Sequence, residues 1–104
     1  MSDIIAVNDD TFEQEVLKSN IPVLVDWSAS WCGPCARQEP ILEKFASENI
    51  GKVKVVKIDI EESFKTTKTY NIYSVPTLMV FKGGQVVQTK SGLSTLVQLY
   101  ALVA

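Results

Sequence analysis

Residues 23–35 read VLVDWSASWCGPC, and this stretch decides the fold. Its first five residues form an almost continuous apolar run, which is typical of a strand covered on both faces of a sheet. It ends with Cys32 and Cys35, the only two cysteines among the 104 residues. Pro34 suits the first turn of a helix, where its missing N–H group leaves no hydrogen bond unmade. The stretch therefore predicts a buried strand that runs into a helix, with both thiols near the junction.

The segments on either side predict further strands and helices. Apolar and β-branched runs predict strands at residues 3–7, 52–59, 77–81 and 85–89. Helices are expected after a capping box of Asp10 and Glu13, at residues 63–70, and from a Ser94 cap to about residue 103. Gly83 and Gly84 can supply the positive φ angles of a tight hairpin turn.

This order, β-α-β-α-β-α-β-β-α, predicts an α/β fold. We expect a central mixed sheet of about five strands, parallel in its first part and ending in an antiparallel hairpin, with about four helices on its two faces. The length suits a single domain over residues 1–104, with no linker or repeat.

Composition excludes several classes of function. The formal net charge is −2, which provides no basic patch for nucleic acid and no polybasic membrane anchor. The chain has no histidine, so Ser-His or Cys-His catalysis and histidine-ligated metal sites are excluded. No secretory segment and no apolar run long enough for a membrane span is evident, which predicts a cytoplasmic protein.

The spacing of the cysteines is by itself ambiguous. Structural zinc normally needs four ligands, so a zinc site would require a dimer, and the pair could also be buried and inert. Redox chemistry is favoured because Cys32 falls between a strand and a helix. Unpaired N–H groups and the helix dipole stabilise a thiolate there.

The chain resembles the thioredoxins over nearly its whole length. The resemblance is carried by the motif Trp31-Cys32-Gly33-Pro34-Cys35 and by Val23–Asp26, Pro40, Lys57, Val75-Pro76-Thr77, Phe81–Gly84 and Gly92. It implies the thioredoxin fold and a general protein-disulfide reductase. Cys32 would attack a target disulfide, and Cys35 would then resolve the mixed disulfide.

The resemblance also implies roles for residues outside the motif. The apolar strand around Asp26 should raise its pKa, and Asp26 would take the proton of the resolving cysteine. Lys57 would pair electrostatically with Asp26. Alternatively, Lys57 could extend out of the sheet to solvent. Pro76 would follow a cis peptide bond beside the disulfide, and the Val75 backbone would pair with an extended substrate. The remaining substrate-binding surface would comprise Trp31, Gly33, Pro34, Ile60 and Gly92.

No bound cofactor is expected besides the Cys32–Cys35 disulfide. The resemblance implies recharging by an NADPH-dependent thioredoxin reductase, and clients such as ribonucleotide, peroxide and methionine-sulfoxide reductases, with the protein acting as a monomer. A disulfide oxidase or isomerase, and a binding scaffold without redox activity, are the alternatives. The oxidising relatives usually carry histidine between the cysteines, and this chain has Gly33 and Pro34 there.

Some positions depart from the usual thioredoxin pattern. Trp27 stands where phenylalanine is usual, and Ala36 stands where a basic residue is usual, with Arg37 next to it. Gln38 and Glu39 are more polar than expected. Trp27 is expected to preserve the packing, whereas the changes at Ala36, Gln38 and Glu39 can alter partner choice or the thiolate pKa.

The C-terminal segment is also unusual, because residues 91–104 carry no charged side chain. Leu93, Leu96, Val97 and Tyr100 are expected to form the core-facing stripe of the last helix. Leu99 and Leu102 would then be exposed, as isolated surface leucines or as part of an apolar contact surface.

Overall fold

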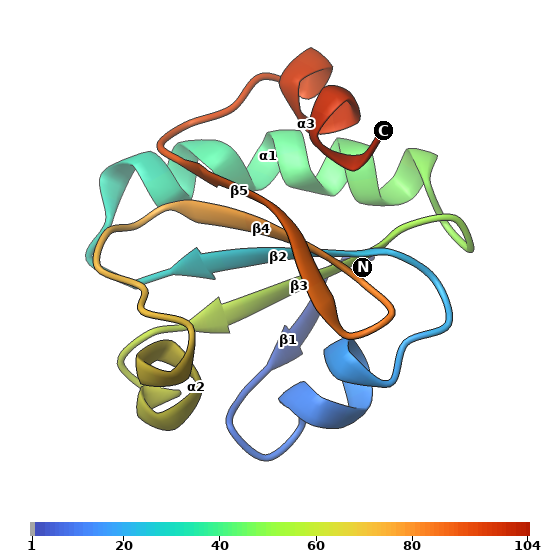
Figure 1. Cartoon of the computed structure of the whole chain (residues 1–104). Coiled ribbons are helices and arrows are strands. Elements are labelled where there is room, and N and C mark those ends of the chain that lie inside the picture. Colours follow the sequence, from blue (N-terminus) through green and yellow to red (C-terminus); the bar gives the residue numbers. More distant parts are fainter. Residues whose placement is uncertain (1) are drawn as a thin grey trace.

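A computed structural model describes residues 2–104 and shows the predicted order of elements (Figure 1). The strands are β1 (Ile5–Val7), β2 (Val23–Ser28), β3 (Lys54–Asp59), β4 (Thr77–Lys82) and β5 (Gln85–Ser91). The helices are α1 (Gly33–Glu48), α2 (Phe64–Thr69) and α3 (Leu96–Val103), together with a short π-helical segment η1 (Glu13–Leu17).

The strands form one mixed sheet in the order β1-β3-β2-β4-β5. β3 pairs in parallel with both β1 and β2, whereas β4 pairs antiparallel with β2 and β5. The hairpin turn between β4 and β5 has positive φ angles at Gly83 and Gly84, as predicted. The predicted mixed sheet and its C-terminal hairpin are therefore confirmed, with β2 at the centre.

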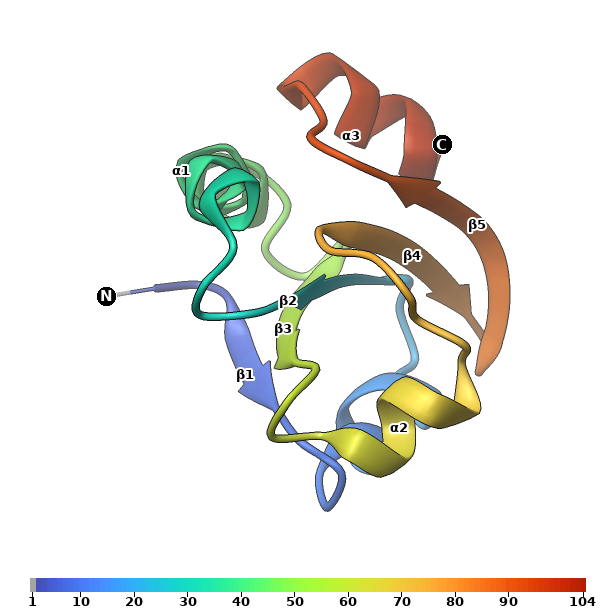
Figure 2. The same ribbon diagram turned by 90° about the vertical axis from the view of Figure 1, so that its left-hand side faces the viewer.

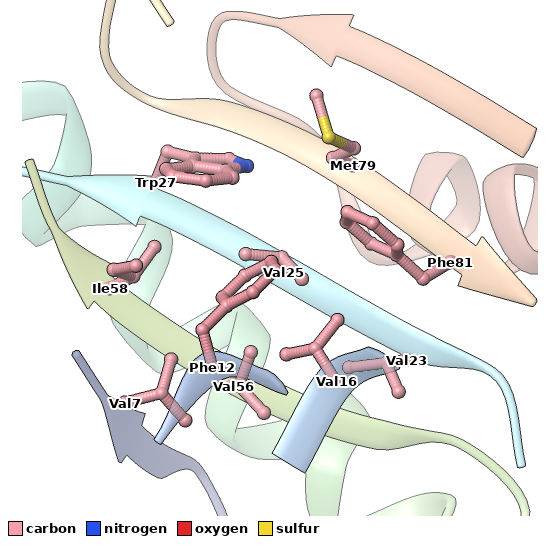
Figure 3. Packing of buried hydrophobic residues seen from close by; sticks show 10 residues of the cluster. All are labelled: Val7, Phe12, Val16, Val23, Val25, Trp27, Val56, Ile58, Met79 and Phe81. Carbon is pink, nitrogen blue, oxygen red and sulfur yellow. The ribbon is translucent and has the colours of Figure 1, made fainter. Parts of the chain in front are cut away.

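Helices cover both faces of the sheet. Figures 1 and 2 show α1 and α3 on one face and α2 on the other. Because side chains alternate along a strand, Val23, Val25 and Trp27 of β2 enter one core cluster, together with Phe12 and Val16 beside them (Figure 3). Leu24 enters a second cluster with α1 and α3. Asp26 is two positions from Leu24, so its side chain lies on the same face of the sheet and faces α1.

Trp27 is accommodated by an aromatic cluster on the α2 face. Its ring centroid lies 5.9 Å from the centroids of both Phe12 and Tyr70, and the side chain is completely buried. Tyr70 in turn meets Phe81 edge to face at 5.3 Å. The large ring therefore fills this core, as expected for a residue that preserves packing.

Two predicted helix caps are wrong. The segment before η1 is held by Asn8, whose Oδ1 accepts from the N–H groups of Asp10 and Thr11, while the Asn8 N–H donates to Thr11 Oγ1. Asp10 therefore donates through its backbone instead of capping. At α3 the cap is Thr95, which forms a complete capping box with Gln98, and not Ser94.

The predicted face of the last helix is also wrong. Leu99 is completely buried, and Leu96, Leu102 and Val103 pack partly buried against the same cluster. Val97 is instead 79% exposed. Leu93 precedes the helix, so counting the helical period from it misplaced the stripe. Counted from Leu96, the core positions lie at i, i+3, i+6 and i+7, on one side of an amphipathic helix.

We expect Leu99→Ala to lower the free energy of unfolding by about 2–5 kcal/mol, because it leaves a cavity in a fully buried site. Val97→Ala, on the same helix, should change it by less than about 0.5 kcal/mol. Denaturant unfolding monitored by tryptophan fluorescence measures both. A larger loss for Val97→Ala than for Leu99→Ala would contradict this assignment of the helix faces.

Candidate active site

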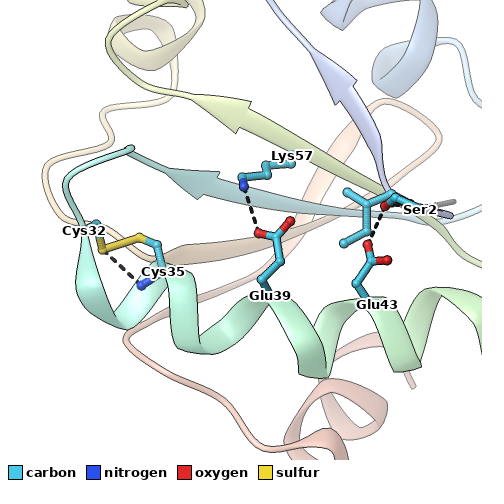
Figure 4. Close-up of polar contacts among 7 residues, drawn as sticks. Ser2, Cys32, Cys35, Glu39, Glu43 and Lys57 are labelled. Carbon is cyan, nitrogen blue, oxygen red and sulfur yellow. Dashed lines mark hydrogen bonds and ion pairs between the residues drawn. A yellow bond between two sulfur atoms is a disulfide. The ribbon is translucent and has the colours of Figure 1, made fainter.

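The two cysteines lie where β2 gives way to α1. Cys32 is the N-cap residue of α1, and its Sγ atom accepts a hydrogen bond from the backbone N–H of Cys35 at 3.1 Å (Figure 4). A disulfide joins the two residues, whose Cα atoms are 5.3 Å apart. The predicted position of Cys32 at a helix N-terminus is confirmed. The Cys35 N–H of the first turn therefore points toward the sulfur that would carry negative charge.

Apolar residues from three segments surround the disulfide. Ala29 is buried with Cys32 and Cys35, and Ile60 and Val75 pack against this small cluster. The Val75–Pro76 peptide bond is cis, as predicted. Trp31 and Gly33 flank Cys32 in the chain. The Trp31 side chain is 65% exposed, and Gly33 is exposed as well. The structure thus brings Ile60 and Val75 together with the cysteines.

Gln38 links the active-site helix to the loop that contains Gly92. The Gln38 side chain is completely buried. Its Oε1 accepts from the Ser94 N–H at 2.7 Å, and its Nε2 donates to the Ser94 carbonyl at 2.9 Å. The N–H of Gly92 donates to the Pro76 carbonyl at 2.9 Å. These contacts hold the two ends of the Gly92–Ser94 segment. One end is bonded to α1 and the other to Pro76, so the segment links α1 to Gly92 and Pro76, two of the predicted substrate-binding residues.

Asp26 is completely buried in β2 on the side that faces α1. Neither of its carboxyl oxygens has a hydrogen-bond partner among residues 2–104. Burial raises the pKa of Asp26 to about 7, while the charge of Lys57 lowers it and that of Glu39 raises it further. The pKa of Asp26 is thus raised chiefly by burial, which is the cause expected from the apolar strand.

Lys57 has a partner that was not predicted. It is the register partner of Asp26 in the adjacent strand β3, and its charge acts on that carboxyl group. Its ammonium, however, forms an ion pair at 2.8 Å with the Glu39 carboxylate on α1 (Figure 4). The expected electrostatic coupling between Lys57 and Asp26 is therefore present, but the direct contact is with Glu39.

The arrangement suits thiol chemistry. A pocket of about 190 Å³ opens beside the disulfide, lined in part by Cys32, Cys35, Lys57 and Asp59. No cluster of three or more histidine, cysteine or acidic side chains suitable for a metal ion occurs within residues 2–104. None of the helices described there is long and apolar enough to cross a bilayer. When it is reduced to two thiols, a cysteine pair at a helix N-terminus can exchange with a disulfide of another molecule, which is reduced while the pair becomes a disulfide.

Comparison with known proteins decides the family. The family model described as Thioredoxin matches residues 3–104. The chain belongs to the thioredoxin family. It is 47% identical to a thioredoxin of Acidithiobacillus ferridurans over 104 residues, which cover 99% of this chain and 96% of the relative. It is 46% identical to a thioredoxin of Pseudomonas aeruginosa over 100 residues, covering 96% and 93%.

A further relative is thioredoxin 1 of Nostoc sp., which is 49% identical over 92 residues, or 88% of this chain and 86% of the relative. With the Cys32–Cys35 pair in place, these similarities show a thiol–disulfide oxidoreductase of the protein-disulfide reductase class. The mixed sheet described above is the thioredoxin fold.

The raised pKa of Asp26 should appear in the pH dependence of stability. Between its ordinary pKa of 3.8 and about 7, the native carboxyl group keeps a proton that the unfolded chain releases. The free energy of unfolding therefore falls as the pH rises through this range, by up to about 1.4 kcal/mol per pH unit. Asp26→Asn removes this dependence, so its stability relative to wild type should rise from about pH 4 to pH 7.5 and then level off. Denaturant unfolding at several pH values measures this, and parallel curves for the two proteins would contradict it.

We expect Gln38→Met to lower the free energy of unfolding by about 1–3 kcal/mol, because the Ser94 N–H and carbonyl lose their buried partners. Methionine keeps similar length and volume, so packing changes little. Hydrogen exchange of the Ser94 amide should accelerate in Gln38→Met and stay unchanged in Gln88→Met, at an exposed position on β5. Unchanged exchange at Ser94 in Gln38→Met would show that the two Gln38–Ser94 hydrogen bonds do not hold the loop.

Proposed function

We propose that this thioredoxin reduces disulfides in client proteins, with Cys32 as the attacking thiolate and Cys35 as the resolving thiol. The observation that carries this assignment is the position of Cys32 as the N-cap of α1, with its sulfur accepting the Cys35 N–H. The same interactions lower the pKa of a thiol and stabilise its thiolate. Cys35 lies inside the first turn of the helix. We therefore assign it the second step, after Cys32 has reacted with the client.

The two steps transfer one electron pair. The Cys32 thiolate attacks one sulfur of the client disulfide, which forms a mixed disulfide and releases the first client thiolate. The Cys35 thiolate then attacks the Cys32 sulfur and displaces the second client thiolate. The client disulfide is reduced to two thiols, and the protein is left with its Cys32–Cys35 disulfide.

Asp26 is proposed as the proton acceptor for Cys35. A thiol must lose its proton before it can attack, and a base works best when its pKa lies near the operating pH. Burial brings the pKa of Asp26 to about 7. Asp26 faces α1, the helix that carries Cys35, so a proton can pass from the thiol toward it through a bridging water. Lys57 adjusts the charge balance of this step through its coupling to Asp26.

The surface proposed to contact clients surrounds Cys32. Exposed Trp31 and Gly33 lie beside it in the motif, Ile60 and Val75 pack against the cysteines, and Gly92 is hydrogen bonded to Pro76. Pro34 is the second residue of α1. An extended client segment would pair with the Val75 backbone, as in β-strand addition. A small, weakly charged surface of this kind suits brief contacts with many clients.

The redox centre is the protein's own dithiol, so the reaction requires no bound cofactor. We propose that an NADPH-dependent thioredoxin reductase returns the disulfide to the dithiol. Ribonucleotide, peroxide and methionine-sulfoxide reductases are suitable clients, because their turnover leaves disulfides that must be reduced. The proposed setting is a cytoplasmic monomer in which residues 1–104 form one domain.

Reduction of insulin by dithiothreitol tests the assignment. Wild-type protein should accelerate insulin precipitation, and Cys32→Ser should leave only the uncatalysed rate, because the attacking thiolate is absent. Cys35→Ser should retain the first step and accumulate a mixed disulfide with the client, visible on a non-reducing gel. Ser47→Ala, at an exposed position farther along α1, serves as the control and should behave as wild type.

If Cys32→Ser catalyses as well as wild type, the assignment of the nucleophile fails. If Cys32→Ser, and not Cys35→Ser, traps the client, the roles of the two cysteines are reversed.

A further inference from the structure

Glu39 lies on the same face of α1 as the active-site cysteine Cys35. The two residues are four positions apart, so their side chains lie one above the other on the helix. Figure 4 shows the Glu39 carboxylate and the Lys57 ammonium directed toward each other between α1 and the sheet. Their atoms are 2.8 Å apart. This distance is that of a charge-assisted hydrogen bond, so the position of the ammonium is set by Glu39.

Lys57 also belongs to the surroundings of Asp26. The two residues are register partners in adjacent parallel strands, so their side chains project to the same, α1-facing side. On the other side of β2, the register partner of Asp26 in β4 is the apolar Leu78. The charged groups that act on Asp26 are Lys57 from β3 and Glu39 from α1. Asp59 shares the pocket beside the disulfide with Lys57.

We propose that Glu39 is a positioning residue, which holds the Lys57 ammonium against α1 and so limits how strongly that charge favours the ionised form of Asp26. The inference rests on the proposed role of Asp26 as the proton acceptor for Cys35. It assigns to Glu39 a part in setting the pH at which the resolving step becomes fast.

The charges act in a defined direction. The positive charge of Lys57 lowers the pKa of Asp26, and the negative charge of Glu39 raises it. Replacing Glu39 with a neutral side chain removes the second effect, which lowers the pKa of Asp26. It also frees the ammonium from α1, and the ammonium lowers that pKa further where it turns toward its register partner Asp26 rather than toward Asp59. Glu39 therefore keeps Asp26 protonated to a higher pH than Lys57 alone would allow.

The contribution of this ion pair to stability is small. The side chains of Lys57 and Glu39 are 41% and 38% exposed, and ion pairs of this exposure add little to stability, because solvent screens the charges. Glu39→Gln should therefore fold normally, since glutamine keeps the shape of the side chain and loses only the charge that forms the ion pair with Lys57. The effect of the substitution on Asp26 can then be measured without loss of structure.

Glu43 provides a matched control. It lies one turn farther along α1, and its carboxylate accepts a hydrogen bond from the Ser2 hydroxyl (Figure 4). Glu43→Gln removes the same charge from the same helix without touching Lys57. A general effect of net charge would appear in both variants, whereas an effect of the Glu39–Lys57 contact would appear in one.

The direct test is the titration of the Asp26 carboxyl carbon by NMR in the reduced protein at low salt. Glu39→Gln should lower the proton affinity of Asp26 roughly threefold to tenfold, and Glu43→Gln should leave it nearly unchanged. Added salt should reduce the difference, because the ion pair is partly exposed. An unchanged titration in Glu39→Gln, or equal shifts in the two variants, would overturn the proposal.

A double-mutant cycle shows whether Glu39 acts through Lys57. In a Lys57→Gln background, Glu39→Gln should change the titration of Asp26 much less than in wild type. An effect of the same size in both backgrounds would mean that Glu39 acts by its own charge alone, and would overturn its role in positioning Lys57.

The pH profile of mixed-disulfide resolution separates this proposal from the proposed role of Asp26. Stopped-flow measurement should show the midpoint of the profile moving to lower pH in Glu39→Gln, together with the titration of Asp26. If the titration moves and the profile does not, Glu39 positions Lys57 as proposed, and the role of Asp26 as proton acceptor fails. If the titration itself does not move, the proposal for Glu39 fails, whatever the profile shows.

Discussion

The rest of the structure depends on the burial of strand β2 at the centre of the sheet. All six residues from Val23 to Ser28 are buried, between β3 on one side and β4 on the other. Burial on this scale leaves the strand one position and one register, because a shift of one residue would turn every side chain to the opposite face. The end of β2 therefore places Cys32 at the start of α1. It also fixes Asp26 on the α1 side of the sheet, away from bulk water.

The two faces of the sheet serve different purposes. On the α2 face, β2 contributes Val23, Val25 and Trp27 to a core of apolar and aromatic side chains. On the α1 face, Leu24 joins an apolar core, but Asp26 introduces a carboxyl group that burial keeps largely protonated up to about neutral pH. Polar contacts of Gln38 and Glu39 gather on the same side, near the cysteines. The protein thus accepts a costly buried group at the position where we propose that the proton of Cys35 is transferred.

Much of this arrangement could be predicted from the sequence because it depends on local patterns. The apolar run before the cysteines, the Gly83-Gly84 turn and the residues shared with thioredoxins led to the correct order of elements along the chain and to the cis bond before Pro76. The caps were harder, since neighbouring residues such as Ser94 and Thr95 have similar capping ability. The face of α3 was misassigned because the period was counted from Leu93, which precedes the helix.

The contacts that adjust the site could not be predicted, because they join residues far apart in the chain. Gln38 meets Ser94 across 56 positions, and Glu39 meets Lys57 across 18. The sequence showed that Gln38 and Glu39 were unusually polar, but it gave no partner for either. Only the packing of α1 against the sheet and the Gly92 loop brings the partners within hydrogen-bond distance.

The central claim is that the Cys32–Cys35 pair serves as a reductant. The most direct test is the reduction potential of this pair, measured by equilibration with a glutathione or dithiothreitol buffer of known potential. We expect a value of about −270 mV, which is typical of thioredoxins. A value of about −120 mV, which is typical of a strong disulfide oxidant, would contradict the assignment as a reductant.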